Sequence, residues 1–318
     1  MCLINAVFLD KASLFPGDLD FSNLEAVARW RWFDNVDPFD IKDQLEEAEV
    51  LVANKVQINR DLIVSCKQLK LICVAATGVN NVDVDAAGDN GVTVCNVRGY
   101  ATSSVAQHVF SLIFSLHGKL FSYKKSVFDG LWSKSPYFCY FGESFGELDG
   151  KTIGIIGYGE LGQAVAKHAR CFGMKVLVAQ RDKSDNRDNR VLLTELLHRS
   201  DVVSLHCPLT SSNRHIIGAV ELAQMKSDAI LINTARGGLV DEQALLSALK
   251  DKQIGAAGLD VLGEEPPSVG HPLINYNADN LIITPHIAWA SQQSRQRLVA
   301  ELAKNIRAYQ EGQVRNVV

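Results

Sequence analysis

Residues 153–162 read IGIIGYGELG, an apolar run that leads directly into glycines at positions 157, 159 and 162. The run is typical of a buried strand, and the residues after it have helical spacing up to Cys171. A glycine pattern in this context suits a dinucleotide, because Gly157 permits a tight turn, Gly159 lets the backbone approach a pyrophosphate and Gly162 allows close helix packing. The amides at the helix start favour the phosphate charge. We therefore predict a Rossmann nucleotide-binding domain here, and the alternative is a glycine-rich turn without a ligand.

Short apolar runs that alternate with helix patterns continue on both sides of this stretch. Downstream, they are residues 175–178, 202–205, 229–233, 255–261 and 281–283. Upstream, they are residues 6–9, 50–53, 71–76 and 92–94. Such alternation predicts an α/β fold with two doubly wound, mainly parallel sheets.

Two longer segments also have helical spacing. Residues 103–123 carry apolar side chains on one broad face and predict a single connecting helix. Residues 291–309 predict a final helix with no strand after it, so we expect it to return to the first domain. The length of 318 residues favours two domains, since single cores tend to stop growing near ~250 residues.

Composition and charge exclude several classes of protein. The formal net charge of −4 and the absence of a long basic run argue against nucleic acid or an anionic membrane as the main partner, so we expect a small molecule. No apolar run approaches the ~18 residues of a membrane span. The seven cysteines show no C-x-x-C spacing and mostly lie in apolar runs, which is typical of reduced thiols in a cytoplasmic protein. The histidines lack metal-ligand spacing, and we expect no metal site.

The choice of cofactor depends on the end of the second strand of this domain. NAD-preferring sites carry an acidic residue there, some ~20 positions after the glycines, to bind the ribose hydroxyls. Gln180 fills this place, so no carboxylate repels a 2′-phosphate, and Arg181 with Lys183 could pair with one. The sequence therefore favours NADPH over NADH. The alternative is that Arg181 only begins a polar loop, residues 181–190, in which arginines are interleaved with Asp and Asn.

Three ionisable residues follow the ends of successive predicted strands. Ligands bind outside the carboxyl ends of parallel strands, so we expect Arg236, Glu265 and His286 in one site. Arg236 can hold a carboxylate with two parallel hydrogen bonds and could polarise a carbonyl, which suits a 2-oxo or 2-hydroxy acid. His286 can give a proton to the carbonyl oxygen as hydride reaches the carbon. A carboxylate would orient this histidine, and Glu265 is the candidate, with Glu264 as its rival.

The chain resembles the D-isomer-specific 2-hydroxyacid dehydrogenases over nearly its whole length. The segments that carry this resemblance occur in the order of that family and are residues 155–162, 207–210, 233–241 and 258–266. Residues 284–290, TPHIAWA, look most like the glycerate dehydrogenase and hydroxypyruvate reductase branch. The resemblance implies catalysis by Arg236, Glu265 and His286, with the glutamate being the one directly before Pro266.

The resemblance also implies a domain arrangement. Residues 1–98 and 287–318 would form a smaller, flavodoxin-like substrate (catalytic) domain, and residues 99–286 the dinucleotide-binding Rossmann domain, with a cleft between them. The subunits would pair as homodimers through the nucleotide-binding domain.

The same resemblance assigns further residues to ligands. Backbone amides of the loop Ala76-Thr77-Gly78-Val79 would bind the substrate carboxylate, although the residues alone indicate only a turn after a strand. The residues that would line the cofactor are Thr102, Gly157, Tyr158, Gly159, Glu160, Leu161, Gly162, Gln180, Arg181, Cys207, Pro208, Thr234, Ala235, Asp260 and His286. From its position alone, Asp260 could equally cap a loop. Trp132 or Trp289 could reach the substrate, or pack in the core or an interface.

We therefore expect a cytoplasmic oxidoreductase that transfers a hydride between NADPH or NADH and a small 2-oxo acid. Hydroxypyruvate and glyoxylate, which give D-glycerate and glycolate, are the first candidates. One alternative is the same chemistry on another substrate, such as D-lactate or 3-phosphoglycerate. A second is a binding protein that senses the nicotinamide pool, as corepressor relatives do. Glu265 argues against the formate dehydrogenases of this fold, which use glutamine beside the histidine.

Overall fold

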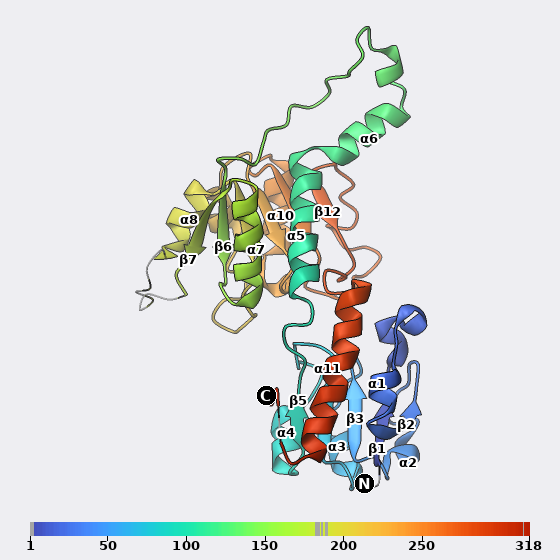
Figure 1. The fold of residues 1–318 in the computed structure, drawn as a ribbon. Helices are drawn as coiled ribbons and strands as arrows, with labels where there is room; N and C mark the ends of the chain where they lie inside the picture. The colour runs from blue at the N-terminus through green and yellow to red at the C-terminus, as the bar shows by residue number, and fades with distance from the viewer. Residues whose placement is uncertain (1–2, 182–184, 186, 188–189, 314) are drawn as a thin grey trace. The chain divides into compact units, whose positions relative to one another are not determined.

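The computed structural model describes residues 3–181, 185, 187, 190–313 and 315–318. They belong to two compact units, Met1–Ala101 with Trp289–Val318 and Thr102–Ala288 (Figure 1). Each unit has its own parallel sheet and its own apolar core. Lys183, considered above for a 2′-phosphate, lies outside the described residues.

The first unit contains a parallel sheet in the strand order β2-β1-β3-β4-β5, which is the flavodoxin-like order. Its strands are β1 (Ile4–Phe8), β2 (Ala28–Trp32), β3 (Val50–Ala53), β4 (Leu71–Val74) and β5 (Thr93–Cys95). Its α-helices are α1 (Ser22–Glu25), α2 (Lys42–Leu45), α3 (Arg60–Ser65), α4 (Val84–Asp89) and α11 (Gln292–Gln310). The short 3-10 helices η1 (Lys11–Leu14) and η2 (Pro16–Asp18) follow β1.

Successive side chains of each strand point to opposite faces of this sheet. Ala6 and Phe8 of β1 pack in the core that α1 and α11 cover, whereas Val7 and Leu9 pack in the core that α3 and α4 cover. Helix α11, at the end of the chain, therefore packs on the sheet that the beginning of the chain builds (Figure 1).

The pattern of apolar runs does not predict strand β2. Its sequence, ARWRW, alternates arginine with tryptophan. This strand lies at the edge of the sheet and only alternate residues face the core, so a continuous apolar run is not required. Strand β8 (Arg190–Val191) is likewise an edge strand, and it begins at the last residue of the mixed-charge segment 181–190.

The second unit contains a parallel sheet in the order β12-β11-β10-β9-β6-β7-β8. Its strands are β6 (Thr152–Ile156), β7 (Lys175–Ala179), β8 (Arg190–Val191), β9 (Val202–Leu205), β10 (Ile230–Asn233), β11 (Ala256–Leu259) and β12 (Leu281–Ile283). Its helices are α5 (Thr102–His117), α6 (Leu120–Phe128), α7 (Glu160–Cys171), α8 (Leu193–Arg199), α9 (Ala219–Ala223) and α10 (Glu242–Lys250), with 3-10 helices η3 (Trp132–Lys134) and η4 (Gly237–Leu239). The strand order reverses between β6 and β9, which is where doubly wound sheets bind dinucleotides. The predicted fold class of two doubly wound parallel sheets is confirmed.

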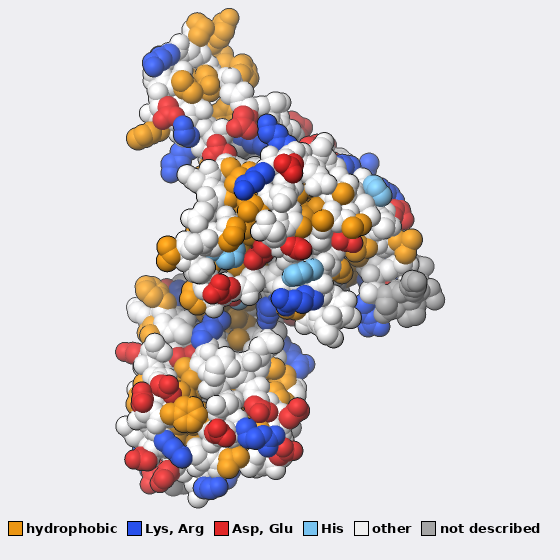
Figure 2. All heavy atoms as spheres, turned by 180° about the vertical axis from the view of Figure 1, so that it is seen from behind, with side chains coloured by type: hydrophobic (Ala, Val, Ile, Leu, Met, Phe, Trp, Pro, Cys, Tyr) orange, Lys and Arg blue, Asp and Glu red, His pale blue; other side chains and the backbone are white. Residues whose placement is uncertain are grey.

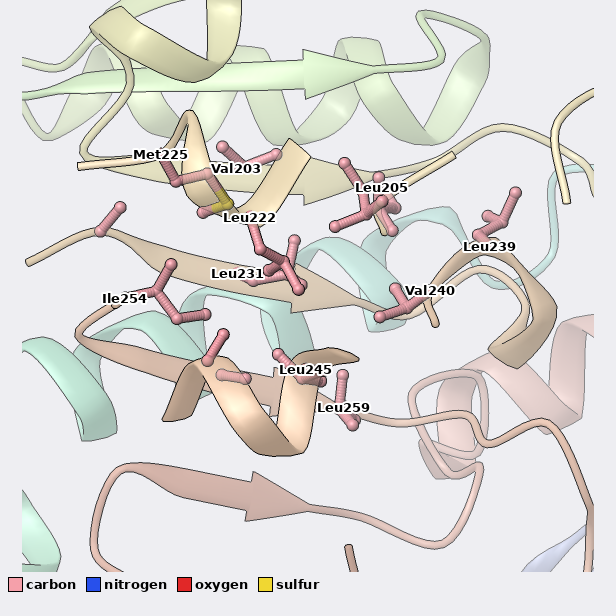
Figure 3. Close-up of a cluster of buried hydrophobic side chains, with 14 of the residues drawn as sticks. Val203, Leu205, Leu222, Met225, Leu231, Leu239, Val240, Leu245, Ile254 and Leu259 are labelled. Carbon is pink, nitrogen blue, oxygen red and sulfur yellow. The ribbon is translucent and has the colours of Figure 1, made fainter. Parts of the chain in front are cut away.

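A buried apolar cluster joins the second sheet to its helices (Figure 3). Val203, Leu231 and Leu259 come from three neighbouring strands of the sheet. They pack with Leu222 of α9 and Leu245 of α10. Burying each such side chain contributes about 1.5–3 kcal/mol relative to exposure. The cluster thereby fixes the strand ends from which the loops of the candidate site begin.

Helix α5 ends at His117 and α6 begins at Leu120, so the prediction of a single helix over residues 103–123 is wrong. Lys119 has a φ of 54°, in the left-handed region, which interrupts the helical backbone. Residues 120–147, the projecting segment, then extend from the second unit (Figures 1 and 2). Its exposed apolar side chains are Leu120, Phe121, Val127, Phe128, Leu131, Trp132, Tyr137, Phe138, Phe141 and Phe145. Even so, no helix in the described part of the chain is long and apolar enough to cross a membrane.

Candidate active site

His286 and Glu265 form a hydrogen-bonded pair at the carboxyl edge of the second sheet. His286 follows β12, and Glu265 lies in the loop after the neighbouring strand β11. Nδ1 of His286 lies 2.7 Å from Oε2 of Glu265, and each side chain is 35% exposed. Because an ionised carboxylate can only accept, the histidine donates through Nδ1. Exchange of a proton with a substrate would then occur at Nε2.

The carboxylate of Glu265 is held at both oxygens. Oε1 accepts a hydrogen bond from the backbone N–H of Leu262 at 2.9 Å, while Oε2 accepts from His286. It is thus Glu265, directly before Pro266, that contacts the histidine, whereas Glu264 is exposed. A carboxylate held in this way can orient the imidazole ring and stabilise its charged form.

Asp260 is buried beneath the loop that carries His286 and is 1% exposed. Its Oδ1 accepts hydrogen bonds from the Thr284 hydroxyl at 2.5 Å and the Ile287 N–H at 2.9 Å. Its Oδ2 accepts from the Ala288 N–H at 2.8 Å. These bonds hold the chain on both sides of His286, whose φ of 54° lies in the left-handed region. Asp260 therefore positions the histidine loop from within the protein.

Arg236 follows β10 in a turn that packs against the loop after β11. The buried Asn233 shapes this turn, because its Oδ1 accepts from the Ala235 N–H at 3.0 Å and its Nδ2 donates to the carbonyl of Arg236 at 2.9 Å. A Cβ atom on Gly237 would lie 1.9 Å from the carbonyl carbon of Leu262. Only glycine allows this approach. The Arg236 side chain is exposed, and its Nη1 donates to the carbonyl of Ala235 at 2.7 Å.

Several residues that sequence reasoning did not single out also hold this edge. Oε1 of Glu242 accepts from the N–H of Gly263 at 2.7 Å, and its Oε2 lies 3.2 Å from Nε2 of His271. Nε2 of His108, on α5, lies 2.9 Å from the Thr284 hydroxyl. Asn233, the last residue of β10, could have been recognised from the sequence, since it is a polar residue at the end of an apolar run. Glu242, His271 and His108 contact residues that are far away in sequence, so no local sequence pattern indicates their role.

Residues 157–162 form the turn after β6 and the first residues of α7, at the point where the strand order reverses. Gly157 has a φ of 94°, and a Cβ there would lie 2.4 Å from the backbone nitrogen of Cys207, after β9. A Cβ on Gly162 would lie 2.1 Å from the carbonyl oxygen of Gly157. By contrast, the described residues leave the space within 4 Å of a Cβ on Gly159 open. Gly159 is also the residue directly before the first turn of α7, whose amides suit a pyrophosphate.

The other residues expected at the cofactor lie in or around this loop. Tyr158 lies in the loop itself, Glu160 and Leu161 are the first two residues of α7, Cys207 and Pro208 follow β9, and Thr234 and Ala235 follow β10. The Thr102 hydroxyl, at the start of α5, donates to Oε1 of Glu160 at 2.5 Å. The Thr234 hydroxyl is buried and has no hydrogen-bond partner among the described residues, so it can bond a ligand. Burial raises the pKa of the Cys207 thiol, which disfavours a reactive thiolate.

The loop after β7 gathers arginines around a buried carboxylate. Asp185, 8% exposed, accepts from Nε and Nη2 of Arg187 at 2.6 and 2.7 Å and from the N–H of Arg181 at 2.9 Å. These donors, Arg187 first, hold the pKa of Asp185 well below its usual range. The guanidinium carbon of Arg190 lies 4.7 Å from the ring centroid of Tyr158. The buried Nε of Arg190 has no hydrogen-bond partner within the described part of the chain.

Loop 76–79 lies in the first unit, directly after β4. The Thr77 hydroxyl donates to the carbonyl of Val97 at 2.9 Å, and the carbonyl of Thr77 accepts from Nδ2 of Asn96 at 2.7 Å. Among the described residues, the backbone N–H groups of residues 77–79 donate to no protein group. The loop is thus fixed by its neighbours and presents amides that can bind an anion.

Residues 110–288 match the family model described as D-isomer specific 2-hydroxyacid dehydrogenase, NAD binding domain. The match covers more than half of the chain. The chain belongs to this family. It is an oxidoreductase that binds a nicotinamide cofactor and acts on a 2-oxo or 2-hydroxy acid, and the resemblance described above is confirmed.

Full-length relatives agree with this assignment. A glycerate dehydrogenase of Methylorubrum extorquens is 45% identical over 316 residues, which cover 98% of this chain and 98% of that protein. A hydroxypyruvate reductase of Blautia hydrogenotrophica is 38% identical, with 98% of each chain covered. The solved structure of an acyclic imino acid reductase with NADPH and D-Arg is 31% identical, covers 99% of this chain and 100% of that one, and has a TM-score of 0.85. These relatives do not favour the alternative of a nicotinamide-sensing binding protein.

Proposed function

We propose that this dehydrogenase reduces hydroxypyruvate or glyoxylate, giving D-glycerate or glycolate, with NADPH as the preferred donor. The observation that carries the proposal is the 2.7 Å contact between His286 and Glu265, which provides a general acid. The relatives named glycerate dehydrogenase and hydroxypyruvate reductase support the choice of substrate.

Each of the three proposed catalytic residues has its own role in the reaction. Arg236 binds the substrate carboxylate or polarises the reacting carbonyl. When bound, the reduced nicotinamide supplies the hydride for the carbonyl carbon. His286 donates its Nε2 proton to the carbonyl oxygen, and Glu265 stabilises the imidazolium from which that proton comes. A 2-oxo acid, NADPH and a proton thereby yield a 2-hydroxy acid and NADP⁺, and His286 takes the proton in the reverse direction.

We assign the two binding tasks to different parts of the chain. Loop 76–79, in residues 1–98 with 287–318, binds the substrate carboxylate through its amides. Residues 99–286 bind the dinucleotide, with the pyrophosphate at loop 157–162. The glycines that admit no Cβ atom at positions 157 and 162, and the open space at position 159, support this assignment.

The preference for NADPH rests on the loop after β7. Gln180 directly follows that strand, so no carboxylate stands at the usual ribose-binding place. Among the residues of this loop that the structure describes, Arg181, Arg187 and Arg190 lie with one carboxylate, Asp185, and the sequence also places Lys183, Asp182 and Asp188 in the loop. A 2′-phosphate would accept charge-assisted hydrogen bonds from these guanidinium groups. The buried Nε of Arg190 is a donor suited to it.

We also propose that the protein is a homodimer whose subunits meet through the second unit. In the projecting segment, Phe128 is 90% exposed, Phe138 93% and Phe141 84%. Large apolar side chains grouped in this way mark an interaction surface, and a second copy of the chain would cover them. Light scattering should give twice the monomer mass. A double variant, Phe138→Ser with Phe141→Ser, should give the monomer, and a wild-type monomer would contradict the proposal.

The function is tested by the loss of absorbance at the nicotinamide band. Hydroxypyruvate, glyoxylate and pyruvate are each mixed with NADH and with NADPH. Turnover of hydroxypyruvate or glyoxylate, faster with NADPH, is the expected result. Absence of turnover with either acid would remove both as substrates, and a preference for NADH would reject the role given to the arginines.

A further inference from the structure

Residues 54–56 follow β3 and are held by the carboxylate of Asp10, just beyond the end of β1. Asp10 is 2% exposed and accepts backbone N–H bonds from Asn54 at 2.9 and 3.1 Å, from Lys55 at 2.6 Å and from Val56 at 3.1 Å. A buried carboxylate that is bonded to three successive amides fixes their backbone. The backbone position of Lys55, two residues after β3, is therefore set by the fold.

This loop lies beside loop 76–79, which we assign to the substrate carboxylate. Strands β3 and β4 are paired neighbours, so the two loops begin at the same edge of the first sheet. Nδ2 of Asn81 donates to the carbonyl of Val56 at 3.0 Å, and the N–H of Ile58 donates to the carbonyl of Asn81 at 2.7 Å. These two bonds join the loops, so that residues 54–56 and 76–79 belong to one surface of the first unit.

The ammonium of Lys55 lies over an aromatic ring. Its Nζ is 5.7 Å from the centroid of the Trp289 ring, within the range in which a ring face attracts a cation. The Trp289 ring packs edge-on against Tyr100, with centroids 6.4 Å apart. The aromatic contact orients the ammonium, whose N–H groups can hydrogen-bond an oxygen atom of a ligand.

We propose that Lys55 selects the substrate by binding an oxygen on its C3 atom. The inference rests on the proposed function, in which loop 76–79 already binds the carboxylate on C1. A cation carried by the neighbouring loop suits a substrate with a second polar group close to the carbonyl. The C3 hydroxyl of hydroxypyruvate accepts a charge-assisted hydrogen bond from the ammonium, whereas the methyl group of pyruvate cannot. Lys55 and Trp289 thus favour 2-oxo acids that carry an oxygen on C3.

The test compares kcat/KM for hydroxypyruvate and pyruvate in the wild type and in Lys55→Met. The wild type should prefer hydroxypyruvate by at least about 30-fold, since a hydrogen bond to a charged group contributes that order of selectivity. The variant should lose most of this preference. Lys55→Arg keeps the charge and should restore most of it, and Lys67→Met, which removes an exposed lysine of the same unit, serves as the matched control.

Each outcome separates this inference from the proposed function. Equal losses of both substrates in Lys55→Met would overturn the inference and make Lys55 a general partner of the carboxylate. A wild type that reduces pyruvate as well as hydroxypyruvate would overturn it without any variant, while leaving the enzyme class intact. A wild type that reduces neither hydroxypyruvate nor glyoxylate would instead reject the proposed function.

Discussion

Gly237 packs directly on the backbone of Leu262, so that a Cβ atom on the glycine would lie 1.9 Å from the carbonyl carbon of the leucine. One of these residues follows Arg236, and the other donates its N–H to Glu265. The contact therefore sets the spacing between the turn that carries the arginine and the loop that carries the glutamate. A substitution at Gly237 should therefore lower the catalytic activity, although it removes no catalytic side chain.

Gly237→Ala should lower kcat/KM by at least about tenfold, because the added methyl group forces the two loops apart and misplaces the reacting groups. It should also lower the free energy of unfolding by about 1–3 kcal/mol, as overpacking does in a dense site. Steady-state kinetics and urea unfolding measure the two effects. Gly270→Ala is the control, since the described residues leave the space within 4 Å of its Cβ open. Equal behaviour of the two variants would contradict the argument.

His286→Asn should lower kcat by at least about 100-fold, because the general acid is lost. Asparagine suits this position, since it tolerates the left-handed φ of 54° that the histidine adopts. The dissociation constant for NADPH should stay within about threefold of the wild-type value, which separates lost chemistry from lost binding. Turnover near the wild-type rate would remove the histidine from the mechanism.

Arg181→Ala should weaken NADPH binding at least about tenfold more than NADH binding, if the guanidinium bonds the 2′-phosphate. Fluorescence titration of each reduced cofactor gives the two dissociation constants without turnover. Arg199→Ala, in an exposed ion pair with Glu195 on α8, is the matched control and should change neither. If Arg181→Ala weakens both cofactors equally, Arg181 is only part of a polar loop.

The stability of the folded protein should fall between pH 7 and pH 5 because of His206, which follows β9. Its Nε2 lies 2.8 Å from the Ser204 hydroxyl, and burial lowers its pKa to about 4. The unfolded chain takes up a proton near the ordinary histidine pKa of ~6.5, so it binds more protons than the folded chain as pH falls through this window. This costs about 2 kcal/mol of unfolding free energy by pH 5. Urea unfolding at both pH values should show a smaller loss in His206→Gln, and an identical loss would exclude His206 as the cause.

Local patterns were enough to predict the architecture and to nominate the candidate site. The run at 153–156 followed by glycines predicts a strand, a tight turn and a helix, because each of these depends on neighbours in the chain. Likewise, a polar residue just past an apolar run lies at the carboxyl edge of a parallel sheet wherever the rest of the sheet lies. Arg236, Glu265 and His286 could be nominated for that reason, and the contact between His286 and Glu265 is present in the structure.

The residues that hold the candidate site in place could not be predicted in the same way. Asp260 holds the histidine loop, Glu242 holds the N–H of Gly263, and Asp10 holds the backbone of Lys55. In each case the carboxylate and its partners are far apart in sequence and meet only after the sheet has formed, so the residue type alone does not identify the partners. For Asp260 the sequence left a cofactor contact and a loop cap as alternatives. The edge strand β2 was missed because only one of its faces is buried and its residues alternate in polarity.

By itself, then, the sequence determined the α/β plan, the nucleotide loop and the identity of the groups that can exchange a proton or bind a carboxylate. These follow from short-range backbone preferences and from side-chain chemistry, which need no partner far along the chain. Only the tertiary structure decided which carboxylate contacts the candidate catalytic histidine and which carboxylates hold a loop. That distinction depends on burial and on hydrogen-bond partners, and both arise from long-range packing.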